Sequence, residues 1–205
     1  MSGFSPRGVG RIGIAALAGA LGLLAASALS AQEVDAWSKG KQWLSVRAGY
    51  ARSAATGAAD GNIGFGFGYT RVRSPKWSFS TAASFEVLGR YGGSSEMEVP
   101  WIVEATRHYK WNTPIRPYLG AGVGFYVHKI SGTSDDGASV IFGPHLSGGF
   151  NTPISDHGLL GFDVRMSSLE SDKQQNSVFG GEAVTGEGQS RVVHWSVKVS
   201  HSWVF

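Results

Sequence analysis

Apolar and polar residues alternate along most of the chain beyond residue 42, and the alternation falls into eight runs. In the clearest of them, Ile63, Phe65, Phe67 and Tyr69 alternate with three glycines and a threonine. The other runs cover residues 43–50, 77–87, 98–108, 118–128, 140–150, 160–167 and 193–205. A period of two is the pattern of strands whose successive side chains point to opposite faces of a sheet. The chain is therefore expected to be all-β, with eight strands of about ten residues each.

The composition of the two faces indicates what surrounds these strands. One face is apolar and aromatic in nearly every run, whereas the other carries Gly, Ser and Ala with a few charged residues. Small residues suit the narrow interior of an eight-stranded barrel, and an apolar exterior needs no second layer in lipid. A soluble sandwich or a lipocalin-like barrel is the alternative, but its wet face would more usually carry Thr, Lys and Glu. The pattern favours an eight-stranded antiparallel up-and-down transmembrane β-barrel over residues 32–205.

The connectors between the runs alternate in length. Long connectors are expected at 52–61, 89–96, 129–138 and 169–190, and short ones at 73–76, 110–114 and 152–157. Outer-membrane barrels have short periplasmic turns and longer outside loops. An even number of strands also places both termini on the periplasmic side.

Three prolines fall within the predicted strands or at their ends. Each removes a backbone donor, and a closed barrel has no free edge where that loss is harmless. Pro117 suits the start of a strand. Pro100 and Pro144 predict β-bulges or a different register in the fourth and sixth strands.

The first 31 residues have the layout of a cleavable secretory signal. Arg7 and Arg11 precede an apolar and small-residue run, and no acidic residue appears before Glu33. Small residues between Ala28 and Ala31 offer the cleavage site. An uncleaved membrane anchor is the alternative, although a run so rich in Ala and Gly is a weak membrane span.

Composition narrows the possibilities further. The chain has no cysteine, so an exported fold must be held by backbone pairing and packing without disulfides. The formal net charge is +3 over the whole chain and becomes +1 when Arg7 and Arg11 are removed with the signal. The basic balance is thus no argument for a nucleic-acid partner.

The last strand carries a family resemblance. Residues 197–205 alternate apolar and polar side chains and end in Phe205, and Phe162-Asp163-Val164-Arg165 looks like part of a penultimate barrel strand. On these residues the mature chain resembles the OmpA/OmpX-type eight-stranded outer-membrane barrels. The resemblance implies a Gram-negative outer-membrane location and an assembly signal at Val199, Trp203 and Phe205. It also implies partners among outer-membrane lipids, lipopolysaccharide, the outer-membrane assembly machinery and periplasmic chaperones, and a monomeric state.

His145 and Ser147 are a weak candidate for chemistry. Two residues apart on one strand, their side chains share a face, as a nucleophile and its base would. The pair is similar to the His-x-Ser element of the outer-membrane lipid A deacylases. However, Gly148 stands where that family's pattern has Asn, no acidic partner is evident, and the alternation points both side chains into the lumen. A polar pair in a lumen network is the favoured interpretation, so no catalytic residue is predicted.

Charged residues on the interior face are expected to pair with one another, because an isolated buried charge is costly. The predicted network comprises Arg47, Glu86, Glu104, Arg116, Asp163, Arg165 and Lys198, with Glu98 and His194 on the same face. The alternative is the lining of a conducting pore. His108, His128, His157 and His201 show no metal-ligand spacing.

The remaining motifs are interpreted structurally. Apolar alternation continues through the glycine-rich segments 64–68 and 120–124, which argues against a phosphate-binding loop, so neither a cofactor nor a metal is predicted. Aromatic girdles are expected where tryptophans fall near strand ends, at Trp43, Trp77, Trp101, Trp195 and Trp203.

Three functions follow from this pattern. The first is a non-enzymatic surface barrel with a structural or adhesion-type role carried by its outer loops. The second is a porin-like passage for small or hydrophobic molecules, as in OmpW-type barrels, and the third is a lipid A hydrolase. The absence of a complete active site and the charged lumen favour the first.

Overall fold

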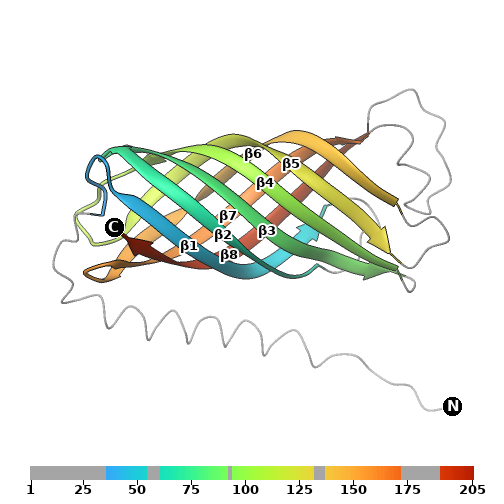
Figure 1. Cartoon of the computed structure of the whole chain (residues 1–205), viewed down its shortest axis with the longest axis horizontal. Helices are drawn as coiled ribbons and strands as arrows, with labels where there is room; N and C mark the ends of the chain where they lie inside the picture. Colours follow the sequence, from blue (N-terminus) through green and yellow to red (C-terminus); the bar gives the residue numbers. More distant parts are fainter. Residues whose placement is uncertain (1–35, 55–60, 92–93, 132–136, 172–189) are drawn as a thin grey trace, which may run out of the picture.

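The chain folds into a closed barrel. The computed structural model describes residues 36–54, 61–91, 94–131, 137–171 and 190–205. Its strands are β1 (Gln42–Ser53), β2 (Asn62–Ser74), β3 (Trp77–Tyr91), β4 (Ser94–His108), β5 (Arg116–Ser131), β6 (Gly137–Ser155), β7 (Gly158–Ser171) and β8 (Ser190–Val204). Each strand pairs antiparallel with its neighbour in the sequence, and β1 pairs with β8 (Figure 1). The eight-stranded up-and-down barrel predicted from the alternation is confirmed.

The N-terminal signal, predicted over residues 1–31, lies outside the described residues. Within the described part of the chain, no helix has the length and apolarity needed to cross a membrane.

The two faces of the strands are those the alternation predicts. On β2 and β6, Phe67 and Leu146 point outward and are 61% and 66% exposed to the surroundings. On β1 and β7, Ser45 and Asp163 point inward and are buried. Because a soluble sandwich would bury the aromatic face, this exterior removes the soluble alternatives.

One predicted connector is wrong. β3 and β4 remain paired up to Tyr91 and Ser94, so the expected connector 89–96 belongs largely to the two strands. A register shift between Val87 and Gly89 accompanies this extension. The residues there are polar because these strands extend past the apolar belt. Their polarity led to the prediction of a connector where the strands continue.

The short connectors mark one end of the barrel. Residues 75–76 and 156–157 form tight turns, and 109–115 join β4 to β5. The start of β1 and the carboxy terminus lie at this same end, where Gln42 and Phe205 exchange two backbone hydrogen bonds (Figure 1). We call it the terminal end.

The internal prolines interrupt the ladder without shifting its register. Pro100 faces Tyr126 of β5, but the β3–β4 pairs stop at Ala83 and resume at Glu86 in the same register. Pro144 faces Val123 of β5, while the β6–β7 ladder ends one residue later, at His145. The bulge or different register predicted at Pro100 is therefore wrong, whereas at Pro144 the β5–β6 register is unbroken and the β6–β7 pairing stops beside the ring. Proline lacks an N–H and cannot donate to the ladder. The pairing is therefore interrupted on the side facing away from β5, toward β3 at Pro100 and toward β7 at Pro144.

A small apolar core closes the terminal end. Trp37 and Trp43 pack edge to face with ring centroids 5.9 Å apart, and Trp43 Nε1 donates to the Ala36 carbonyl at 2.8 Å. Gly40, with φ of 95°, turns the chain from this core into β1. The buried cluster consists of Ala36, Trp37, Trp43, Val72, Leu159 and Val204.

The predicted aromatic girdle is only partly correct. Trp77 and Trp203 lie at strand ends and face outward, 43% and 45% exposed. Trp195 packs against Tyr50 with ring centroids 5.4 Å apart. Trp101 is outward but central in β4, and Trp43 faces the interior, where it is buried. An odd position on β1 points inward, and that parity outweighs the tendency of tryptophan to face the membrane interface.

Candidate functional site

Most of the buried polar side chains among the described residues lie in the lumen, and glycines give them room. A Cβ on Gly120 would stand 2.8 Å from Glu104 Cδ and would also strike Ser147 Oγ. A Cβ on Gly68 would lie 2.7 Å from a guanidinium nitrogen of Arg47. Such distances are shorter than real contacts allow, so these glycines accommodate the large charged residues of neighbouring strands.

The first part of the network is a buried ion pair. Lys198 Nζ contacts Glu86 Oε1, and both side chains are almost fully enclosed. Ser84 donates a hydrogen bond of 2.7 Å to the same carboxylate oxygen. A lysine and a glutamate can be buried together in this way because each neutralises the other and the serine supplies a further donor.

The second part is centred on Glu104. Its Oε2 atom lies 3.1 Å from His145 Nε2 and 3.6 Å from Arg165 Nη2, and Thr106 donates to its Oε1 at 3.0 Å. Arg165 Nη2 also lies 3.7 Å from Asp163 Oδ1. These contacts join β4, β6 and β7 across the interior.

Tyr118 completes this side of the lumen. Its hydroxyl donates to Asp163 Oδ2 at 2.7 Å. Asp163 therefore accepts from a tyrosine of β5 and faces an arginine of its own strand, so its charge is compensated on two sides.

The two remaining residues of the predicted network, Arg47 and Arg116, lie apart from these ion pairs. Arg47 lines the interior, where its guanidinium extends over Gly68, and it has no carboxylate within ion-pair distance among the described residues. Arg116 lies at the terminal end, with its Cζ 4.2 Å from the centre of the Trp37 ring. As the first residue of β5, it stacks on the aromatic core at this end.

A third cluster lies toward the other end of the lumen. His194 Nδ1 lies 2.8 Å from Glu98 Oε2, and His128 lies 3.8 Å from the same oxygen. His128 Nε2 is also 3.4 Å from Glu96 Oε1. Sequence reasoning placed Glu98 and His194 on the interior face but missed His128 as their neighbour. The signal was present, since His128 occupies an inward position of its run, directly opposite Glu98.

The structure supplies the acidic neighbour that His145 appeared to lack, but not in a triad geometry. The acid, Glu104, meets the His145 Nε2 atom on β6 from β4. Ser147 Oγ and His145 Nδ1 are both buried and have no hydrogen-bond partner in the described part of the chain. A serine nucleophile needs a hydrogen bond to its base and access to substrate. Both residues face the lumen, as the alternation predicts, away from the lipid that a deacylase would act on.

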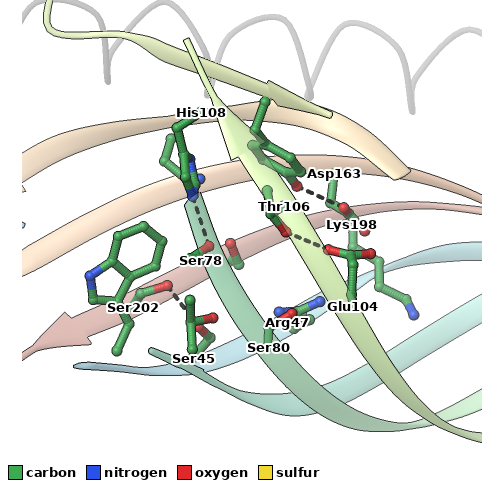
Figure 2. A pocket seen from close by; sticks show the side chains of 15 residues that line it. Ser45, Arg47, Ser78, Ser80, Glu104, Thr106, His108, Asp163, Lys198 and Ser202 are labelled. Atoms are coloured by element: carbon green, nitrogen blue, oxygen red, sulfur yellow. Dashed lines mark hydrogen bonds between the residues drawn. The ribbon is translucent and has the colours of Figure 1, made fainter. Parts of the chain in front are cut away.

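Two small cavities lie between these groups. The larger, of about 40 Å³, lies between Arg47, Glu104, His108 and Asp163, and Ser and Thr hydroxyls line much of the rest of its wall (Figure 2). Within it, Ser45 bonds Ser202 and Ser78 bonds His108, each at 2.8 Å. The smaller cavity, of about 10 Å³, lies beside Glu98 and Tyr126. Volumes of this size hold about one to three water molecules.

The described residues of the interior form no group suited to a metal ion. Among residues 36–54, 61–91, 94–131, 137–171 and 190–205, no group of three or more His, Asp or Glu side chains has a geometry that could hold a metal ion.

Comparison with known proteins identifies the fold. No protein-family model and no curated protein matches the sequence. The structure is similar to Neisserial surface protein A, with a TM-score of 0.62 and 12% identity over 80% of this chain and 99% of that one. It is also similar to the N-terminal barrel of Pseudomonas aeruginosa OprF (TM-score 0.54, 11% identity, 82% of this chain, 100% of that one). A third similar structure is Ail of Yersinia pestis (TM-score 0.55, 11% identity, 82% and 99%).

These similarities agree with the exterior of the barrel. Outward-facing apolar side chains on β2, β4 and β6, such as Phe67, Trp101 and Leu146, are more than half exposed. In lipid this belt is in its preferred surroundings. The chain thus has the fold and the apolar belt of the eight-stranded outer-membrane β-barrels, and its place is the outer membrane.

Proposed function

We propose that this protein is a non-enzymatic surface barrel whose outer connectors bind a partner outside the cell. The observation that carries the proposal is the filled interior. Its carboxylates Glu86 and Glu104 are each neutralised by a cation, and the cavities beside these groups measure only about 40 and 10 Å³. The Trp37–Trp43 core adds a closure at the terminal end. With the interior used for stability, the outer connectors are the surface left for function.

Two of the similar proteins support this proposal through their described roles. One is named a surface protein, and Ail is described as an attachment invasion locus protein. Ail has also been crystallised with the heparin analogue sucrose octasulfate. For the present chain, an attachment role is inferred from this similarity of fold alone.

The charge of the outer connectors suggests a partner of different chemistry. Residues 54–61, 132–136 and 172–189 contain six acidic residues and one lysine. Opposite charge steers association, whereas like charge suppresses it. The partner is therefore expected to present a basic surface, and a sulfated polysaccharide is disfavoured.

The C-terminal strand supports integration by the assembly machinery. Val199, Trp203 and Phe205 all face outward and are 43%, 45% and 58% exposed. We propose that the outer-membrane assembly machinery binds these three side chains before the barrel closes. Periplasmic chaperones keep the unfolded chain soluble until then. The lipids and lipopolysaccharide of the outer membrane then surround the apolar belt, and the barrel acts as a monomer.

The test uses bacteria that carry the full protein. Cells with the wild-type chain are expected to adhere to an immobilised basic protein layer and not to heparin. Replacing Asp172, Glu182 and Glu187 by the corresponding amides should reduce this adhesion several-fold, while Asp156→Asn at the terminal end should not.

Two results would contradict the proposal. The first is adhesion that is unchanged by the three substitutions. The second is stable single-channel conductance of the purified wild-type barrel, which would favour passage of small molecules instead.

A further inference from the structure

Exposed cations gather outside the barrel at its terminal end. Arg71 and Arg73 are on β2, Lys76 is in the β2–β3 turn, and Arg107 is on β4; all four are exposed. We call these four residues the basic patch. On the strands they alternate with the inward-facing Val72 and His108, so their side chains point away from the lumen.

The patch is built around stacked aromatic rings. Arg107 and Trp77 are directly opposite each other on β4 and β3. The Arg107 Cζ atom lies 5.8 Å from the centre of the Trp77 ring and 5.5 Å from that of Tyr109. Stacking on two rings fixes the planar guanidinium and leaves its N–H groups available to a ligand.

No carboxylate of the described residues compensates these charges. Among the described residues, none of the four patch cations has an acidic side chain within ion-pair distance, because Glu86, Glu98, Glu104 and Asp163 are buried in the lumen. The positive charge of the patch is therefore not compensated by these residues, and an anionic ligand could compensate it.

The position of the patch indicates the source of that charge. Arg71 is directly opposite Phe79, and Arg107 is directly opposite Leu119. Phe79 and Leu119 face outward and are 54% and 60% exposed, as expected for the edge of the apolar belt. Cations just beyond such an edge lie at the level of lipid headgroups. The short turns, together with the start of β1 and the end of β8, assign this end to the periplasmic leaflet.

We propose that the basic patch binds the phosphodiester of an anionic phospholipid, of the phosphatidylglycerol class, in the periplasmic leaflet. The Arg71 and Arg107 guanidinium groups pair with the phosphate oxygens, for which their fork of donors is well suited. The acyl chains of the same lipid lie along Phe79 and Leu119. At the opposite end, Lys129 is an exposed cation of β5 that does not belong to the patch.

The experiment is native mass spectrometry of the full protein, extracted in mild detergent and supplied in turn with phosphatidylglycerol, phosphatidylethanolamine and lipid A. Wild type is expected to retain phosphatidylglycerol above phosphatidylethanolamine. Each lost cation should weaken retention roughly five-fold, so R71Q/R107Q should lose roughly 25-fold. Lys129→Gln is the matched control and should retain the lipid as wild type does. The single variant Arg107→Gln provides the same test if the double variant does not fold.

Four results would overturn the proposal. Equal retention of the two phospholipids would show that charge is not recognised. Unchanged retention in R71Q/R107Q, or an equal loss in Lys129→Gln, would remove the patch as the site. Preferential retention of lipid A through these arginines would assign the patch to lipopolysaccharide instead.

Discussion

Glu86 on β3 and Lys198 on β8 form an ion pair inside the barrel, although 112 residues separate them in the sequence. Their side chains are only 7% and 0% exposed. The pair links two strands that are not neighbours in the barrel, and it anchors the β8 strand that closes on β1.

Removing one partner of this pair should be more harmful than removing both. Lys198→Met leaves Glu86 as an uncompensated buried charge, and we expect a loss of about 3–5 kcal/mol in the free energy of unfolding. Urea unfolding of the barrel in detergent micelles measures the effect. The double variant E86Q/K198M should recover most of the loss, and Lys129→Met, on the exterior, should change little. Equal losses in the single and the double variant would contradict this account of the pair.

The terminal core should depend on the Trp43 ring. Trp43→Ala removes a buried side chain that packs on Trp37 and donates to Ala36, so we expect the free energy of unfolding to fall by about 3–5 kcal/mol. Trp43→Phe keeps an aromatic ring, so its free energy of unfolding should fall by less. Leu119→Ala, which removes a lipid-facing side chain, serves as the comparison for a position where no protein cavity forms. A Trp43→Ala barrel as stable as wild type would mean that this cluster is not a core.

Glycine at position 120 should be required for space. Gly120→Ala places a methyl group against Glu104 and Ser147, and we expect a destabilisation of about 1–3 kcal/mol from overpacking. Gly148→Ala is the matched control, because there a Cβ would meet the outer side chain of Leu119 at 3.2 Å and no lumen group. The same urea titration compares the two variants, and the idea fails if Gly148→Ala is the more damaging change.

Ser147 should have no catalytic effect. Ser147 Oγ makes no hydrogen bond to His145, and both residues are enclosed in the lumen. Lipid A from cells that express the wild-type protein should have the same acyl chains as lipid A from cells without it, and Ser147→Ala should match both. Loss of an acyl chain that depends on Ser147 would establish the hydrolase that this geometry disfavours.

The sequence was sufficient for the strands because each buries one face, and the period of two is strong wherever an outward Phe or Leu alternates with an inward Gly or Ser. It was insufficient where polar residues continue a strand past the belt, as in β3 and β4 between Gly89 and Glu96. It also misjudged Pro100, which was expected to cause a bulge or a different register. A missing N–H can be tolerated on one side of a strand while pairing continues on the other.

The site was predicted less well, because its contacts depend on cross-strand geometry. Glu104 and His145 are 41 residues apart, and nothing local to either indicates the contact of 3.1 Å between them. Interior parity correctly placed both in the lumen. It could not identify partners, since a narrow barrel lets strands touch across its interior as well as along its ladders. For Arg116, the stacking on Trp37 depends on how the segment before β1 folds back, which the alternation does not describe.

The most direct test of the central claim is the migration of the outer-membrane fraction on a cold and on a boiled detergent gel. A closed barrel with a neutralised, filled interior should resist detergent in the cold, so the protein should migrate as a compact band that shifts only on boiling. Recovery of the protein in the soluble periplasm, with no shift on boiling, would contradict the account.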